Sequence, residues 1–180
     1  DGAGTPEAFD AKLDARAGDV ASATGDVVIR RDGATRRATL DLAGRIDRLA
    51  PKELAVLFAD ATRIEGQGHL GDDGDLKLDR LSLRASAFEL TASGEAARDG
   101  RISANAALHG AVNAKGAAFR AKKLEGALRI SGTRARPAAD LSLEVEAAEG
   151  PAGRIGRIDL TAKATADGDL SDAAARIDIQ

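Results

Sequence analysis

Apolar and polar residues alternate with a period of two along most of the chain. Between residues 88 and 96, for example, Phe88, Leu90 and Ala92 alternate with Glu89 and Thr91. The same alternation recurs over residues 38–46, 101–109, 141–146, 158–165 and 175–179, and more weakly over 9–13 and 21–29. Alternation of this kind is typical of strands that bury one face and hydrate the other, and it predicts about ten or eleven strands.

Asp-Gly pairs separate several of these alternating runs. Such a pair supplies the two positive-φ positions of a type I′ turn, which joins neighbouring antiparallel strands. We therefore expect type I′ hairpins at the four pairs, Asp32-Gly33, Asp73-Gly74, Asp99-Gly100 and Asp167-Gly168.

Residues 49–61 depart from the alternation. Leu54, Leu57, Phe58 and Ala61 follow the i, i+3, i+4, i+7 spacing of one helical face, and Pro51 suits a first helical turn. The spacing predicts one short amphipathic helix between strands.

Glycine recurs on the apolar side of the strands, at positions 25, 44, 68, 94, 110 and 132. A glycine inside a strand marks a bend or the close approach of another backbone, so the recurrence predicts a curved sheet. The alternation changes phase between Leu78 and Leu81, which predicts a β-bulge around Asp79-Arg80.

Composition argues against one thick core. Hydrophobic residues make up 43% of the 180 residues, but 40 of them are alanine and only four are aromatic. Aromatic side chains supply much of the area that a compact core buries. We therefore expect residues 1–180 to form a single, mainly β unit. Its elongated, curved and mostly antiparallel sheet would form an apolar trough, shaped like a half-pipe, with the short helix at 49–61.

The apolar strand positions are the candidate groove and are expected to share one face. They are Leu40, Leu42, Ile64, Leu76, Leu78, Phe88, Leu90, Ile102, Leu108, Leu128, Ile130, Leu141, Leu143, Val145, Ile158, Leu160, Ile177 and Ile179. The opposite face is expected to carry Lys77, Glu89, His109, Arg129, Glu144 and Lys163. The first and last strands, near 9–13 and 173–179, are expected to be open edges at which the chain self-associates.

Catalytic and cofactor motifs are weak. The G-x-G-x-x-G run at 66–71 precedes no predicted helix, and the acidic cluster Asp72, Asp73 and Asp75 lacks the EF-hand spacing. His69 and His109 have no positioned nucleophile. The net charge of −3 and the scarcity of aromatics argue against nucleic acid. We expect neither an enzyme nor a bound metal or cofactor.

The hairpins at 76–96, 124–133 and 170–180, with the helical insertion at 48–62, resemble the TamB-like periplasmic proteins of the AsmA-like superfamily of Gram-negative bacteria. The resemblance implies a long half-pipe sheet that carries phospholipid between the inner and outer membranes. It also implies a periplasmic location, an inner-membrane anchor and an outer-membrane barrel assembly partner elsewhere in a longer protein. This chain would be an interior or C-terminal segment.

Two other functions fit the same pattern. A chaperone-like module would offer sheet edges to nascent outer-membrane strands. A structural β-solenoid would bury the apolar face as its own dry core. Because period-two strands with one apolar face need a cover, either the sheet closes on itself or a ligand such as acyl chains covers it.

Overall fold

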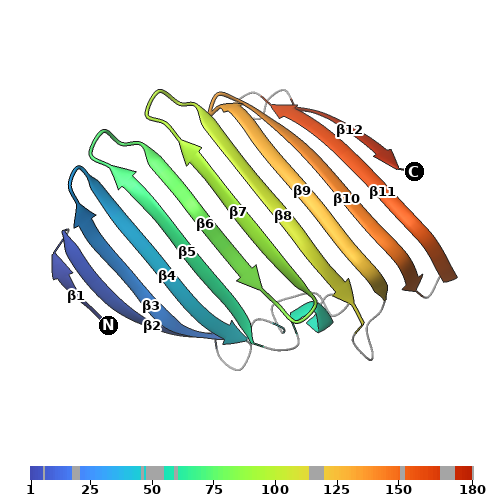
Figure 1. The fold of residues 1–180 in the computed structure, drawn as a ribbon, viewed down its shortest axis with the longest axis horizontal. Coiled ribbons are helices and arrows are strands. Elements are labelled where there is room, and N and C mark those ends of the chain that lie inside the picture. The colour runs from blue at the N-terminus through green and yellow to red at the C-terminus, as the bar shows by residue number, and fades with distance from the viewer. Residues whose placement is uncertain are drawn as a thin grey trace.

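The computed structural model describes residues 1–5, 7–17, 21–45, 47, 55–58, 61–113, 120–150, 153–166 and 173–179. They form one open, curved antiparallel sheet in which the strands lie side by side in sequence order (Figure 1). The strands are β1 (Gly2–Thr5), β2 (Ala8–Ala17), β3 (Ala21–Asp32), β4 (Thr35–Arg45), β5 (Thr62–Gly71), β6 (Leu76–Arg84), β7 (Phe88–Ala96), β8 (Ile102–Val112), β9 (Ala121–Thr133), β10 (Arg136–Gly150), β11 (Gly153–Ala166) and β12 (Ala173–Ile179). The predicted mainly β, antiparallel, curved fold is confirmed.

The predicted turn type is wrong in the described hairpins. The two central residues of the β3–β4 turn are Gly33, with φ 62°, and Ala34, whose φ is not positive. A positive φ at the first central residue alone defines a type II′ turn, whereas type I′ needs it at both. Gly74 and Gly100, with φ 91° and 92°, are instead the last residues of four-residue turns. Their N–H groups close these turns by donating to the carbonyl oxygens of Gly71 and Ala97, each at 3.0 Å. In each case glycine alone takes the left-handed conformation, because aspartate pays a steric penalty there. Asp167-Gly168 lies outside the described residues.

The predicted helix is described only at Ala55–Phe58, where the chain forms a one-turn 3-10 helix, η2. The rest of residues 49–61, apart from Ala61, lies outside the described residues. The Phe58 ring meets the Phe88 ring edge to face, with centroids 5.4 Å apart. Leu57 packs against a small core of Ala87, Val112 and Ala121. Thus η2 covers the sheet over one end of β7 to β9.

The β-bulge at Asp79-Arg80 is confirmed. Gly68 pairs with Leu78 and Gln67 pairs with Arg80, so Asp79 is the extra residue. The irregularity continues into the next ladder, where pairing jumps from Leu78 to Leu81. The bulge therefore returns the residues after it to the face that Leu78 occupies.

The sheet leaves an unusually large area in water. Its accessible surface is 11737 Å², whereas a compact protein of 18.4 kDa exposes about 8,200 Å². Among the described residues, only Ala87, Val112 and Ala121 are buried hydrophobics. The described residues thus form a single layer with little core of its own.

The N-terminal edge differs from the prediction. Residues 9–13 lie in β2, and the short strand β1, which the alternation did not predict, covers the outer side of β2 from Ala8 to Ala11. Asp1 and Lys12 exchange two backbone hydrogen bonds, so the N–H and C=O groups of the even-numbered β2 residues point away from β3. Beyond Lys12, these outward backbone groups have no described partner. At the other end, no described strand pairs with the outer side of β12.

We expect the open edge of β2 to drive self-association that a single proline suppresses. Asp14→Pro removes an outward N–H and spares the hydrogen bonds to β3, whereas Ala15→Pro removes a bond to β3 and destabilises the sheet. Sedimentation at rising concentration should show reversible association for the parent chain and much less for Asp14→Pro. A strictly monomeric parent chain at high concentration would contradict this expectation.

Candidate functional site: the apolar face

The strand register assigns the candidate groove positions to one face of the sheet. Directly paired residues of antiparallel strands project to the same side, so the pairings can be followed from strand to strand. All the candidate positions from Leu40 to Leu160 fall on one side, which we call the apolar face. In β12 the backbone register aligns Ile177 with Ala162 and Ile179 with Leu160.

Three continuous rows of apolar residues cross the sheet on this face, perpendicular to the strands. The central row is Leu13, Gly25, Leu42, Ile64, Leu83, Leu90, Leu108, Gly126, Leu143 and Leu160. The second is Gly2, Ala11, Val27, Leu40, Gly66, Leu81, Ala92, Ala106, Leu128, Leu141 and Ala162. The third is Gly4, Phe9, Ile29, Ala38, Gly68, Leu78, Gly94, Ala104, Ile130, Ala139 and Ala164. No position in the three rows is charged or polar.

Several members of these rows were missing from the candidate set. Leu81 and Leu83 follow the phase change in β6, and only the bulge at Asp79 aligns them with the apolar face. Leu13 and Val27 lie in strands whose alternation is weak. Each of these residues could have been placed on the apolar face by aligning its strand with a neighbouring strand whose face was already known.

Large apolar side chains on this face remain in contact with water. The exposed ones among the described residues are Leu13, Leu70, Leu76 and Leu141, which are 40% to 52% exposed. All four project from the apolar face by the register. No described element is packed over these rows, because η2 contacts Phe88 and the small core of Ala87, Val112 and Ala121, which lie beyond them.

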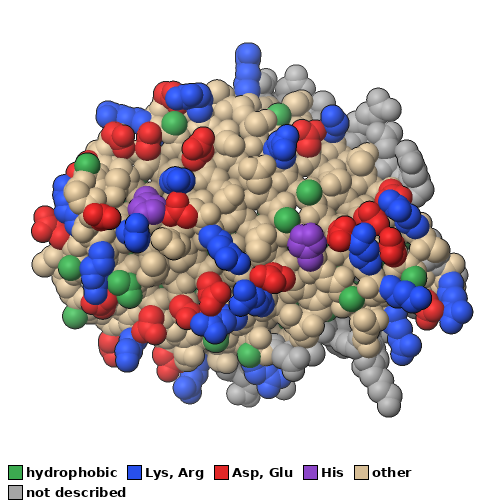
Figure 2. Space-filling model, in the orientation of Figure 1, with side chains coloured by type: hydrophobic (Ala, Val, Ile, Leu, Met, Phe, Trp, Pro, Cys, Tyr) green, Lys and Arg blue, Asp and Glu red, His purple; other side chains and the backbone are tan. Residues whose placement is uncertain are grey.

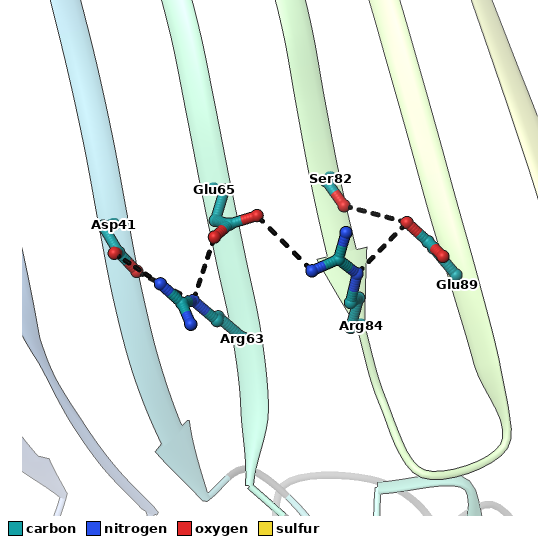
Figure 3. A network of polar contacts seen from close by, with 6 residues as sticks. All are labelled: Asp41, Arg63, Glu65, Ser82, Arg84 and Glu89. Carbon is teal, nitrogen blue, oxygen red and sulfur yellow. Dashed lines mark hydrogen bonds and ion pairs between the residues drawn. The ribbon is translucent and has the colours of Figure 1, made fainter.

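The opposite face carries most of the charges, although the register places Arg31 and Arg36 on the side of Leu70 at the end of the apolar face. Figure 2 shows lysine, arginine, aspartate and glutamate side chains interspersed over the opposite face, with both histidines among them. Across β4 to β7 the charges form a linked chain of ion pairs (Figure 3). In that chain Arg63 contacts Asp41 at 2.7 Å and Glu65 at 3.1 Å, and Arg84 contacts Glu89 at 3.2 Å. Opposite charges on neighbouring strands stabilise the pairing of those strands.

A second ion-pair cluster crosses β9 to β11. Lys123 Nζ lies 3.1 Å from Glu125 and 3.2 Å from Glu144, and Arg157 lies 3.4 Å from Glu144. The hydrogen bond from Lys123 lowers the pKa of Glu144, and hydrogen bonds to Glu125 and Glu144 raise the pKa of Lys123. At the β7–β8 turn, hydrogen bonds from the backbone and then the side chain of Arg101 lower the pKa of Asp99.

These lowered pKa values predict acid sensitivity. A carboxylate with a depressed folded-state pKa stabilises the fold above its unfolded pKa, and the contribution is lost as pH falls through the folded value. The unfolded reference values are 4.5 for Glu144 and 3.8 for Asp99. Urea midpoints should therefore fall as the pH drops below about 4.5, with a smaller fall in Glu144→Gln. A midpoint independent of pH between 5 and 3 would contradict this prediction.

The other polar motifs make contacts within the sheet in the described residues. Arg37 Nε donates to His69 Nε2 at 3.0 Å, and His69 Nδ1 lies 2.6 Å from Asp79, a contact that the bulge creates and the sequence spacing concealed. Asp72 binds Arg31 and Arg36. The glycine run at 66–71 lies within β5 and opens no helix. No cluster of three metal-ligating side chains occurs among the described residues.

None of the helices described is long and apolar enough to cross a membrane. No protein-family model, curated protein or solved structure matches this chain.

Proposed function

We propose that this chain is a segment of a bridge-like periplasmic protein whose apolar face carries phospholipid between the inner and outer membranes. The observation that supports the proposal is the set of three unbroken apolar rows on a face that no second layer of described residues covers. The charged face keeps the other side of the sheet hydrated. The resemblance to TamB-like proteins supports the same function, with the curved sheet forming the wall of an apolar trough.

The energetics of such a surface match lipid transfer. Moving an acyl chain through water costs about 0.8 kcal/mol per methylene, or on the order of 12 kcal/mol for a sixteen-carbon chain. The longer rows run from β1 to β11, which at a strand spacing of about 4.8 Å extends them over roughly 48 Å across the sheet. A continuous apolar surface of that length removes most of the cost without specific contacts. The surface is passive, so direction must come from the membranes or from a partner.

A chaperone-like role is the second candidate, and the open edge of β2 supports it. The outward backbone groups of β2 beyond Lys12 have no partner among the described residues and can pair with an extended segment of an outer-membrane protein. The solenoid alternative is weaker, because the sheet is a linear meander whose first and last described strands do not pair with each other.

Photo-crosslinking from adjacent positions of β7 tests the proposal. A crosslinker at Leu90, in the central row, should capture phospholipid in cells, whereas one at Glu89, on the charged face, should capture little. Equal capture from both faces, or none from either, would reject the conduit. Capture of outer-membrane protein strands at β2 without lipid at Leu90 would favour the chaperone-like role.

A further inference from the structure

The apolar face is open at one end of the strands, and at the other end η2 covers it over β7 to β9. One end of the strands carries the β3–β4, β5–β6 and β7–β8 turns, which we call the hairpin tips. There Leu70 and Leu76 flank the β5–β6 turn and are 42% and 52% exposed. At the opposite end Val112 and Ala121 have no exposed surface, and Leu57 of η2 packs against them. Figure 1 shows η2 at the end of the sheet away from these tips.

The distance between the two ends suits an acyl chain that lies parallel to the strands. Leu76 and Leu83 lie on β6 and on the same face, about 20 Å apart at 3.3 Å per residue. The chains of one lipid leaflet span about 15 Å, which is half of the hydrocarbon core of a bilayer. A chain whose head is at Leu76 therefore ends between Leu81 of the second row and Leu83 of the central row, before η2.

The hairpin tips present charges of both signs beside the open end. Asp72 in the β5–β6 turn lies 2.6 Å from Arg31 and 3.0 Å from Arg36, and all three side chains remain about one-third exposed. At the next tip Asp99 lies 2.7 Å from Arg101. A zwitterionic headgroup finds partners for its phosphate and its ammonium at such a rim.

We propose that phospholipid binds this face in one orientation, with its headgroup at the hairpin tips and its chain ends directed toward η2. The inference rests on the proposed function and specifies how the lipid lies. Lipids would then advance from strand to strand along the rows while their headgroups stay in water at one rim.

Fluorescence quenching in single-cysteine variants tests the orientation, because the chain contains no native cysteine. A bimane label is placed at Leu76→Cys or Leu83→Cys on the apolar face, or at Lys77→Cys on the charged face. Each protein is mixed with phosphatidylcholine that carries a nitroxide on the headgroup or at carbon 16 of one chain.

We expect the headgroup nitroxide to quench the label at Leu76 at least twice as strongly as the label at Leu83. The chain-end nitroxide should show the reverse order, and the label at Lys77 should respond weakly to both. Equal or inverted quenching at Leu76 and Leu83 would overturn the orientation but retain lipid binding. Quenching at neither apolar position would reject the proposed function as well.

Discussion

Replacement of Leu143 by aspartate is expected to abolish lipid capture by this segment. Leu143 lies in the central row between Gly126 and Leu160, so the new carboxylate would stand in the acyl path without a cationic partner. Placing an unpaired polar group in an apolar environment costs about 1–3 kcal/mol in proteins. We expect the free energy of unfolding to fall by that amount and crosslinking of lipid from Leu90 to be lost.

The matched control is Ser142→Asp, which places the same carboxylate one residue away on the opposite face. Ser142 pairs with Ala127 and Thr161, so no charge opposes it directly. Glu144→Lys, which the alternation alone would treat as neutral, is a poor control, because Glu144 contacts both Lys123 and Arg157. A folded Leu143→Asp protein that still captures lipid normally would contradict the conduit, whereas folded protein without capture supports it.

Alanine at Gly110 is expected to destabilise the sheet by about 1–3 kcal/mol through overpacking. A Cβ at this position would collide with the Ala87 carbonyl oxygen and lie 2.8 Å from Phe88 Cβ. Both contacts belong to the neighbouring strand connection beneath η2, which cannot withdraw without disturbing the small core. Urea unfolding of Gly110→Ala should show a reduced midpoint with an unchanged slope.

Gly66→Ala provides the comparison, because Gly66 also projects from the apolar face. A Cβ there would meet Leu40 Cβ at 3.5 Å and Leu81 Cδ1 at 3.6 Å, which are ordinary contacts. The change should be neutral or stabilising by about 0.4–1 kcal/mol, since alanine reduces the entropy of the unfolded chain. If both alanines had the same effect, close backbone approach would not be the reason for glycine at position 110.

The phase change within β6 shows what the alternation along one strand predicts and what it leaves undetermined. Leu78 and Leu81 differ by three residues, which places them on opposite faces of a regular strand, and the sequence predicted the bulge that reconciles them. The partner of the extra residue was not predictable. Asp79 meets His69 because β5 and β6 pair in one particular register, and that register depends on the whole hairpin.

The sequence by itself determined the antiparallel β class, the bulge and the two-faced character of the strands, because side chains alternate with a period of two along any extended backbone. Only the tertiary structure decided the continuity of the three rows, the edge strand β1, the ion-pair chains and the placement of η2 over Phe88. Each of these depends on which residues of separate strands stand opposite one another. Alternation assigns a residue to a face, but hydrogen-bonded pairing between strands assigns it to a neighbour.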